Sequence, residues 1–492
     1  MKNSILVIIF VAGLIVLNPG VEVWAQETHV GRLSHLEGKV FFQSGRSLEW
    51  VEGYVNSPVQ EGDRIWMDVA ARGELDLVNS VLVRMNSDTK LDVVRMGASG
   101  TIVKVWIGSI FVRITDDGNR ENPKFVETPD GQVEFLSKGL FRIEATQENS
   151  TLIRAYEGVL ETKSSTSSAT LRKGELVQIN QNGQLTSVTP IPQTDKDDFT
   201  IYNASRDERL VEPESNKHVH SSVTVGVYDL DYYGIWVHDP LYGYCWQPRS
   251  HAGWAPYRFG RWVWIRPWGW TWISYDPWGW APYHYGYWYY SSQYGWMWKP
   301  DRYYGPHWVV WTAHTSSVGW VPMHPKDAAH VHWSANGHHW QADVSDPVNA
   351  TLNPEIGAST FITREDFQQG KLIKSNEEIV KVEKSEISKW QPEPAQDIKP
   401  VRQAISKLPS GKVRDAEKTS PDRRLVPGQE RRKVPTQRRD VQKQRPQSER
   451  PPQRTTSEKA ETKKDETKKD TDQKKSDKEP DKDPEKKPEV KK

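Results

Sequence analysis

The chain has 492 residues, enough for about three domains of ordinary size, with 33 glycines, 32 prolines and 23 tryptophans. Its formal net charge of +1 at pH 7 gives no overall field that would attract nucleic acid, so we expect no nucleic-acid partner. The single cysteine, Cys245, excludes an intramolecular disulfide, and we expect it to be buried in a strand.

The first 25 residues have the pattern of a secretory signal peptide. Lys2 precedes an apolar run from Ile5 to Leu17, and Val23-Trp24-Ala25 forms a cleavage site. The run is shorter than the roughly 20 apolar residues that a membrane-spanning helix needs. We therefore expect cleavage after Ala25 rather than an uncleaved anchor, and no membrane span in the mature protein. The protein would be exported, and periplasmic, outer-membrane-associated or secreted.

Residues 29–190 are predicted to form an all-β domain. Short β-type runs alternate with glycine or polar turns, and no helical periodicity separates them. Examples of these runs are Gly38–Phe42, Gly73–Val78, Val81–Met85 and Lys90–Val94. Many short strands at this spacing predict a β-roll, a sandwich or a solenoid.

Several motifs in this stretch occur in the order found in FecR-like domains, which the region resembles. The matching motifs are Gln60–Ile65, Arg72–Leu75, Asn86–Leu91, Phe125–Gly131, Gly139–Ile143, Tyr156–Leu160 and Leu171–Glu175. The resemblance implies an envelope protein, and the best-known members carry signals from an outer-membrane receptor to a cytoplasmic sigma factor. That task uses a cytoplasmic segment and a membrane span before the β domain, which here begins just after the predicted signal peptide. The resemblance therefore favours an extracytoplasmic binding or scaffolding module.

Between residues 223 and 373, tryptophan, tyrosine, glycine and proline recur with a period of 26 residues. The residues in register include Gly234, Gly260 and Gly286, then Trp236, Trp262 and Trp288, then Gly243, Gly269 and Gly295. A fixed period of this size indicates one repeated supersecondary unit. Alternation on both sides of the turn Arg266–Gly269 predicts that this unit is a β-hairpin, and stacked hairpins would bury one another's faces.

The repeats resemble an uncharacterised family of Trp/Tyr/Pro-rich domains that follow FecR-like domains in bacterial envelope proteins. The matching stretches are Gly253–Tyr257, Gly279–Gly286, Val318–Pro322 and, at the end of the domain, Thr360–Phe367. Because that family has no assigned activity, the resemblance implies an architecture more than a function.

Two interpretations of the aromatic rings are open. The rings can form the core of a repeat that is too short to bury much else, or some can face outward as platforms for sugars or cages for cationic groups. Rings in the middle of strands, such as Trp262, Trp264, Trp270 and Trp272, are the better core candidates. The candidate ligand-binding rings are those beside prolines, namely Trp254, Tyr257, Trp280, Tyr283 and Trp320.

Little in the sequence supports catalysis, and no cofactor is expected. Asp276 is the one carboxylate between Gly243 and Pro300, whereas a glycosidase ordinarily uses two facing carboxylates. The sequence contains no Gly-x-Ser-x-Gly and no His-Glu-x-x-His motif.

A weak candidate for a metal site lies among the histidines near the end of the repeats. A hairpin turn at Asn336-Gly337 would pair Ser334 with His339. His330, His332 and His339 would then share one face, where three imidazoles could bind Zn or Cu. The alternative is that these histidines are exposed polar positions of a hairpin.

Three further segments are polar or charged. Residues 191–222 are predicted to be a linker or an edge segment packed on one domain, and residues 374–390 a possible short helix. Residues 391–492 are predicted to be a disordered tail, because so few apolar residues cannot offset the entropy of folding. From Val401 to Arg450 this tail has 15 Lys/Arg against 6 Asp/Glu, so it could contact anionic surfaces, although a solvated spacer is the alternative.

Together these features predict an exported, non-enzymatic binding or scaffold protein of the cell envelope that contacts glycan or a protein partner. An alternative is a FecR-type regulatory or sensor element in envelope signalling that acts through a separate membrane partner. A wall-acting hydrolase is the third possibility.

Overall fold

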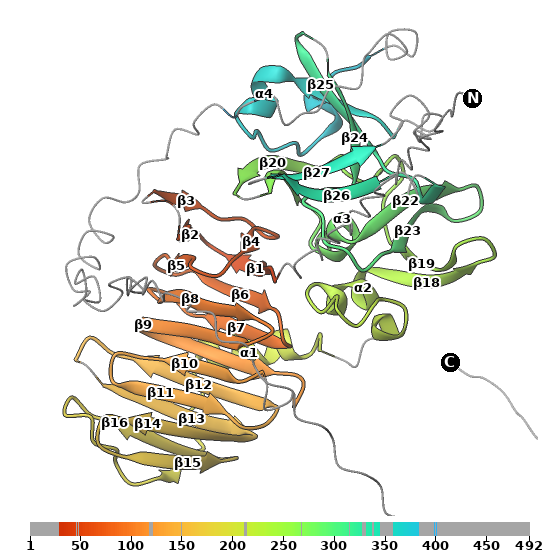
Figure 1. Ribbon diagram of the computed structural model, residues 1–492. Helices are drawn as coiled ribbons and strands as arrows, with labels where there is room; N and C mark the ends of the chain where they lie inside the picture. The colour runs from red at the N-terminus through yellow and green to blue at the C-terminus, as the bar shows by residue number, and fades with distance from the viewer. Residues whose placement is uncertain are drawn as a thin grey trace, which may run out of the picture. The chain divides into compact units, whose positions relative to one another are not determined.

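The computed structural model describes residues 29–382 apart from 46, 48, 118–121, 149, 211–213, 267, 314, 327–330, 337–338 and 345–357, and it also describes Ile398 and Pro400. These residues form mostly β-strands with a few short helices (Figure 1), which confirms the predicted all-β class. None of the described helices is long and apolar enough to cross a membrane. The predicted signal peptide, and the predicted tail apart from Ile398 and Pro400, lie outside the described residues.

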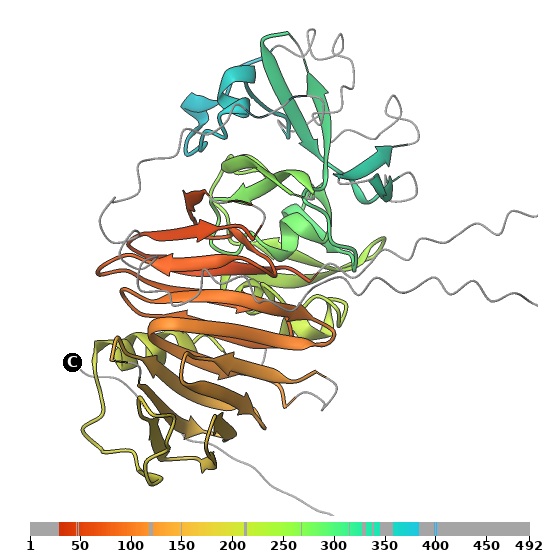
Figure 2. The ribbon, with the colours of Figure 1, turned by 60° about the vertical axis from the view of Figure 1, so that its left-hand side comes forward.

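The first domain is built from two layers of strands (Figure 2). Its strands are β1 (Gly31–Glu37), β2 (Val40–Gln43), β3 (Trp50–Glu52), β4 (Pro58–Val59), β5 (Arg64–Met67), β6 (Arg72–Leu77), β7 (Val81–Met85), β8 (Lys90–Gly97), β9 (Gly100–Ile114), β10 (Lys124–Glu127), β11 (Gly131–Phe135), β12 (Gly139–Ala145), β13 (Thr151–Glu157), β14 (Val159–Ser164), β15 (Ser168–Arg172), β16 (Glu175–Ile179) and β17 (Thr189–Pro190). Sheet A has the order β4-β1-β6-β7-β9-β12-β13-β16-β17. Sheet B has the order β3-β2-β5-β8-β9-β10-β11-β14-β15. Described neighbours are antiparallel except β9 and β10, which are parallel.

The long strand β9 belongs to both layers. Its first half pairs with β8 and β10 in sheet B, and its second half, from Gly108 to Ile114, pairs with β12 in sheet A. At Gly108, φ is +102° and an added Cβ would lie 2.6 Å from the Thr89 Cα atom. Both the left-handed backbone and this close approach require glycine at the point where the strand changes layer.

The core of the first domain lies between the two layers. Alternate residues of each strand point inward, as the period of a strand requires. Fully buried inward residues include Leu75, Val83, Ile143, Ile153 and Val177 from sheet A, and Ile65, Leu91, Val105, Val126 and Leu160 from sheet B. The opposite face of sheet A carries the charged side chains that position the candidate site.

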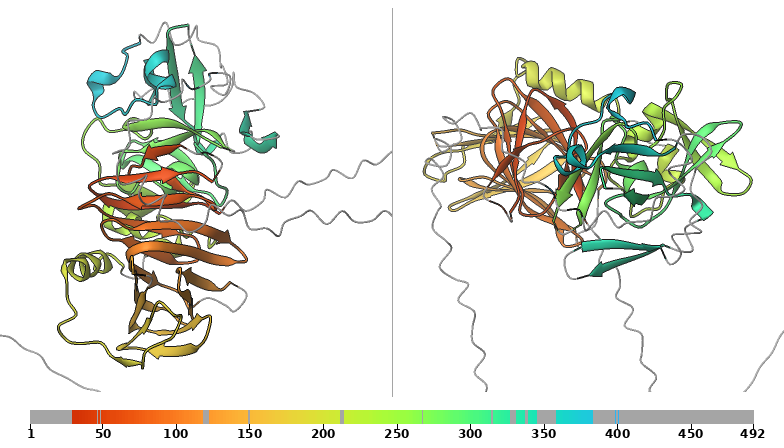
Figure 3. Two further views of the ribbon diagram at one scale, coloured as in Figure 1. Left: turned by 90° about the vertical axis from the view of Figure 1, so that its left-hand side faces the viewer. Right: turned by 90° about the horizontal axis from the view of Figure 1, so that it is seen from above.

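The segment predicted as a linker or packed edge contains a helix, α1 (Asp198–Asp207). Asp197 caps it by accepting a hydrogen bond from the Thr200 N–H at 2.8 Å. Figure 3 shows α1 beside the strands of the first domain. Phe199 and Tyr202 of the helix pack against Phe111 on the outer face of sheet A. The segment is therefore packed on the first domain for at least the length of α1.

The second domain consists of hairpins at the predicted spacing. Its described elements are η1 (Glu214–Lys217), α2 (Val227–Tyr233), β18 (Gly234–Asp239), β19 (Gly243–Pro248), β20 (Gly260–Ile265), β21 (Gly269–Ser274), α3 (Ala281–His284), β22 (Gly286–Ser291), β23 (Gly295–Pro300), β24 (Val309–Ala313), β25 (Ser317–Pro322), β26 (Val331–Asn336), β27 (His339–Val344), β28 (Thr360–Thr363), α4 (Arg364–Gln368) and η3 (Asn376–Glu378). Tryptophans face each other across four of the hairpins, as Trp236 and Trp246, Trp262 and Trp272, Trp288 and Trp298, and Trp311 and Trp320. The turn glycines Gly243, Gly269 and Gly295 have φ values of 72°, 83° and 75°, which explains the 26-residue glycine register.

The hairpins associate out of chain order. The first and third join in the sheet β18-β19-β23-β22, through a pairing of Trp246 with Trp298. The second hairpin, β20 and β21, forms a two-stranded sheet of its own, and β28 extends the fourth to give β24-β25-β28. The repeat period therefore sets the hairpin, while side-chain packing sets which hairpins meet.

The chain after the hairpins departs from two predictions. In place of a helix over 374–390, the described part of that range has the short η3, because the backbone is already extended at Ile379 and the Val380 N–H bonds to the Phe361 carbonyl at 2.8 Å. Ile398, inside the predicted disordered tail, is 2% exposed. The Trp270 indole N–H donates to its carbonyl at 2.9 Å, so the chain is anchored there.

Candidate functional site

The five rings predicted to bind a ligand lie in the core of the second domain. Trp254 is 6% exposed, and Tyr257, Trp280, Tyr283 and Trp320 are each 0% exposed. The prediction that these rings face outward is therefore wrong. A neighbouring proline does not hold them on a surface loop, because the Trp-Ala-Pro-Tyr stretch of the later copy folds inward, with α3 starting at Ala281.

Hydrogen bonds make Tyr257 a structural centre of this core. Its hydroxyl donates to the Tyr283 carbonyl at 2.6 Å and accepts from the Trp308 N–H at 2.9 Å. The Trp320 indole N–H donates to the Tyr257 carbonyl at 2.7 Å. Tyr257 has a φ of 59°, a conformation that a bulky residue holds only when its surroundings fix it. The Pro-adjacent rings thus connect hairpins to one another.

The rings in the middle of the second hairpin behave largely as predicted. Trp262, Trp270 and Trp272 are 1%, 2% and 0% exposed, which confirms them as core. Trp264 is partly buried, with its ring centroid 5.5 Å from that of Trp270 in an edge-on arrangement. Aromatic packing of this kind stabilises a small core beyond the area that it buries.

The predicted register of the histidine hairpin is wrong. Asn336 pairs with His339, and Ser334 pairs with Gln341 rather than with His339. In the predicted register His332 lies two residues along the strand from the position opposite His339, whereas in the structure it lies four residues away, about 7 Å farther. His330 lies outside the described residues. Among the described residues no cluster of three His, Cys, Asp or Glu is suited to a metal ion.

The outer face of sheet A carries two rows rich in charged residues and is here called the charged face. One row across the strands, set by cross-strand pairing, contains Glu74, Arg84, Phe111, Arg142 and Arg154. The next row contains Arg32, Asp76, Leu82 and Arg113. Most of these groups are shielded from water, for Arg84 is 0% and Arg142 is 4% exposed. Charged groups at such depth need partners.

α1 and the loop before it supply many of these partners. From α1, Asp207 pairs with Arg84 at 2.6 Å, and Arg206 pairs with Glu74 at 2.7 Å. From the loop before α1, Asp197 pairs with Arg142 at 2.7 Å and Asp195 with Arg154 at 2.6 Å. Within the sheet, Arg84 also pairs with Glu74 at 2.8 Å. Although burial acts to raise it, Arg206 and Arg84 lower the pKa of Glu74 well below its ordinary value. The helix is therefore fixed on the sheet by paired charges as well as by Phe199 and Tyr202.

A second group of buried charges joins the two domains, and we call it the joint. The Arg32 guanidinium, 2% exposed, donates from Nε to Asp76 Oδ2 at 3.3 Å and from Nη1 to Asn56 Oδ1 at 2.9 Å. It also forms an ion pair with Asp229 of α2. The Gly226 N–H, at the start of α2, donates to Asp76 Oδ2 at 2.8 Å. Asp76 and Asp229, from different domains, thus share one arginine.

The side chain of Asn56 extends the joint to the second hairpin. Its amide donates to the carbonyls of Ser274 at 3.2 Å and Asp276 at 2.8 Å. Nearby, the Arg261 guanidinium lies 4.0 Å from the centroid of the Tyr54 ring. The joint therefore contacts both α2 and the end of β21.

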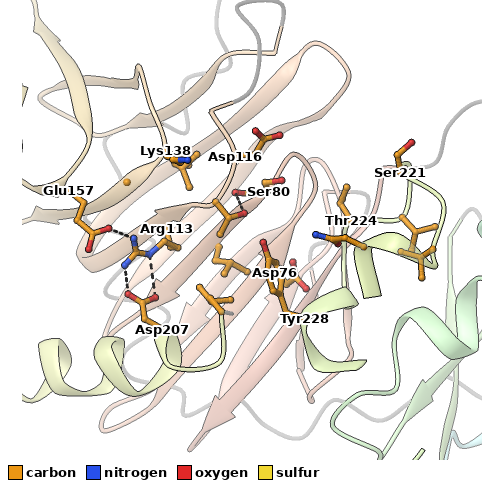
Figure 4. Close-up of a pocket in the computed structure, with 18 of the residues that line it drawn as sticks. Asp76, Ser80, Arg113, Asp116, Lys138, Glu157, Asp207, Ser221, Thr224 and Tyr228 are labelled. Atoms are coloured by element: carbon orange, nitrogen blue, oxygen red, sulfur yellow. Dashed lines mark hydrogen bonds and ion pairs between the residues drawn. The ribbon is translucent and has the colours of Figure 1, made fainter. Parts of the chain in front are cut away.

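Between α1 and residues 214–228, part of the charged face stays open as a cleft of about 990 Å³ (Figure 4). Its carboxylates are Asp76, Asp116, Glu157 and Asp207, and its cationic groups are Arg113 and Lys138. Apolar lining comes from Leu82, Ile114 and Val223, and hydroxyls from Ser80, Thr224 and Tyr228, among others. Figure 4 shows Arg113 lying between Glu157 and Asp207, with which it forms ion pairs. The cleft can hold a polar ligand through hydrogen bonds and ion pairs.

Burial has the largest effect on the titratable groups at the inner end of the cleft. Burial raises the pKa of Asp76 to about 6, and the negative charges of Asp229 and Glu74 act in the same direction against the opposing effect of Arg32. Burial also raises the pKa of Tyr228, and the charges of Asp76 and Asp116 raise it further. Asp76 belongs to both the cleft and the joint, so its protonation state affects both.

The raised pKa of Asp76 predicts a specific pH dependence of stability. In the unfolded chain this carboxyl titrates near its ordinary pKa of 3.8, and in the folded protein near about 6. Its contribution to stability is thus fully present below pH 3.8 and is lost as the pH rises through about 6. We expect the Asp76→Asn protein to lack this component when unfolding free energies are measured from about pH 4 to 8.

The test compares the free energy of unfolding of the native and Asp76→Asn proteins at each pH. Asp276, whose pKa burial also raises to about 6, gives a component of the same sign in both proteins. Burial lowers the pKa of His284 to about 4 and that of His307 to about 3, so both histidines give the opposite sign, also in both proteins. Parallel pH profiles for the two proteins would contradict the assignment to Asp76.

Sequence reasoning missed the charged face and the cleft, although a signal was present. Four β-type runs carry an arginine between apolar neighbours, in Val83-Arg84-Met85, Val112-Arg113-Ile114, Phe141-Arg142-Ile143 and Ile153-Arg154-Ala155. Alternation places these arginines on one face of their strands and the apolar residues on the other. Four arginines at outward positions of their strands indicated that acidic residues from another segment cover this face.

Comparisons with known proteins give limited matches. The family described as "Family of unknown function (DUF6600)" matches residues 227–327, inside the second domain. No curated protein matches. Two crystal structures of a "putative anti-sigma factor" from Parabacteroides distasonis ATCC 8503 are similar at 19% and 18% identity, each with a TM-score of 0.24. Each match covers 26% of this chain and 59% of the solved chain.

Proposed function

We propose that this chain is an exported, non-enzymatic binding or scaffold protein of the cell envelope, and that the cleft holds a segment of a protein partner. The cleft is the observation that carries the proposal, because its volume of about 990 Å³ combines an apolar lining with paired charges and hydroxyls. Burial of the Pro-adjacent tryptophans favours a protein partner over glycan, since those rings cannot stack on sugars without unfolding.

The joint supports a scaffolding role for the two domains. Arg32, Asp76 and Asp229 connect the domains through buried ion pairs, and Asn56 adds hydrogen bonds to the backbone of the second hairpin. A joint of this kind resists bending, because separating the domains would leave unpaired charges. The cleft, whose lining comes from sheet A, α1 and residues on both sides of Gly226, therefore keeps its shape when a partner is absent.

The proposal predicts saturable binding of the full chain to isolated cell envelopes that disappears after the envelopes are treated with protease. Replacing Thr224, which lines the cleft, with tryptophan should obstruct part of the cleft and reduce the affinity by about tenfold or more. Binding is measured with fluorescently labelled protein on intact and protease-treated envelope fractions.

Thr170→Trp is the matched control, because Thr170 is exposed on β15 in sheet B, away from the cleft lining. It should bind like the native protein. Binding that survives protease and is unchanged by Thr224→Trp would contradict the proposal and would favour an envelope polymer bound elsewhere on the chain.

A further inference from the structure

We propose that the segment held in the cleft is basic, an extended stretch rich in lysine or arginine that belongs to a separate protein. This inference rests on the proposed function, because it names the chemistry of the partner for the same cleft.

The balance of charge in the cleft is negative. Four carboxylates, those of Asp76, Asp116, Glu157 and Asp207, line it together with two cationic groups. One of the two, Arg113, is 15% exposed and already forms ion pairs with both Asp207 and Glu157. An acidic ligand would have to displace these carboxylates from Arg113, whereas a cationic group can approach them while the existing pairs stay in place.

The second cationic group lies at the rim. Lys138 is 66% exposed, and its Nζ atom is 3.7 Å from Asp117. Charges at such exposure are largely screened by solvent. At the inner end of the cleft, Asp76 is buried and forms an ion pair with Arg32, which it shares with Asp229. The excess of carboxylates that a ligand meets thus lies in the lining itself, where four carboxylates accompany two cationic groups.

The lining also fits the long side chains of basic residues. Leu82, Ile114 and Val223 supply the apolar part of the cleft lining. Lysine and arginine place their methylene stems on apolar surface and their charged ends against oxygen atoms. Hydroxyls of Ser80 and Thr224 are available within the same lining for the backbone of an extended segment.

The proposal is tested by the affinity of the full chain for short synthetic peptides that alternate serine with lysine, glutamine or glutamate. Fluorescence anisotropy should show the lysine peptide binding at least about tenfold more tightly than the glutamine peptide at low ionic strength. That preference should weaken at about 0.15 M salt. The glutamate peptide should bind least.

Substitutions of residues at the rim test whether the lysine peptide binds in the cleft. At low ionic strength, where exposed charges are least screened, Asp116→Asn removes a carboxylate and should weaken binding of the lysine peptide by about twofold, whereas Lys138→Glu should strengthen it by about twofold. Glu134→Gln, on β11 of sheet B, removes a carboxylate away from the cleft lining and is the matched control. All variants should melt at the temperature of the native protein, because Asp116 and Lys138 are exposed.

Each result either supports or overturns the inference. Equal affinity for the lysine and glutamine peptides, or no effect of Asp116→Asn in a protein that melts normally, would overturn it. If the glutamate peptide bound more tightly than the lysine peptide, the inference of a basic segment would be wrong. The proposal of a protein partner would still stand, provided that Thr224→Trp reduces binding to envelopes. If Thr224→Trp did not reduce binding to envelopes, the proposed function itself would be contradicted.

The chain contains a basic stretch of its own, with 15 Lys/Arg against 6 Asp/Glu between Val401 and Arg450. A chain that ends at Pro400 retains every described residue and serves as the comparison. Equal affinity of the lysine peptide for this shortened chain and the full chain supports a separate protein. An affinity about tenfold higher for the shortened chain would show competition by its own residues and overturn the separate source.

Discussion

Replacing Trp280 with alanine is expected to destabilise the second domain strongly rather than to remove a binding surface. Trp280 is 0% exposed, and its ring centroid lies 4.5 Å from that of His284 and 6.3 Å from that of Tyr304. It also packs on Gly226, where an added Cβ would lie 3.0 Å from the Trp280 Cδ1 atom. The cavity left by a buried tryptophan costs about 3–5 kcal/mol, a large part of the roughly 5–15 kcal/mol that stabilises a domain.

Intrinsic fluorescence during chemical denaturation measures this effect, because 18 of the 23 tryptophans lie between Trp236 and Trp340. Tyr275→Ala is the control, since Tyr275 is 59% exposed and its loss should cost at most about 0.5 kcal/mol. A Trp280→Ala protein that loses less than about 1 kcal/mol and also loses glycan binding would restore the exposed-platform interpretation of these rings.

The hairpins could be predicted from the sequence because their determinants are local. A turn glycine such as Gly269 needs a left-handed φ, and alternating residues on each side of it fix two strands. The pairing of Trp262 with Trp272 follows from that turn alone. Where the turn was placed one residue too early, at Asn336-Gly337, each predicted pairing partner was wrong by two residues.

The burial of the Pro-adjacent rings could not be predicted in the same way. Whether Trp254 or Trp280 faces water depends on which hairpin covers it, and the hairpins meet out of chain order. Trp254, for example, packs against Trp278 and Trp288, with centroid distances of 5.5 and 5.6 Å. Tertiary packing determines such contacts between repeats, and the alternation of residues within one repeat does not predict them.

The cleft depends on contacts that are still more distant in sequence. Arg113 meets Asp207 across 94 positions of the chain, and Arg32 meets Asp229 across 197. Alternation correctly places such charges on the outer face of a strand, but an outward charge is ordinarily a solvated one. The charges of sheet A are buried and paired because α1 and α2 cover them, and the sequence of a single strand does not show this cover.

Replacing Arg32 with methionine is expected to cost about 3–5 kcal/mol at neutral pH, although methionine fills a similar volume. The substitution removes the guanidinium that Asp76 and Asp229 share, and leaves two carboxylates near each other in a buried joint. The loss should be smaller near pH 5, because protonation of Asp76, whose pKa is already about 6 in the native protein, removes one of the unpaired charges. Chemical denaturation at both pH values measures the difference.

Arg64→Met provides the comparison for a pair on the surface. Arg64 is 52% exposed, and its Nε atom lies 3.6 Å from Asp92, so its loss should cost about 1 kcal/mol or less and depend little on pH. In the Arg32→Met background, replacing both Asp76 and Asp229 with asparagine should recover part of the lost stability, because no buried charge then lacks a partner. If Arg32→Met and Arg64→Met were equally mild, the charges of the joint would have to be solvated, and the two domains could move independently.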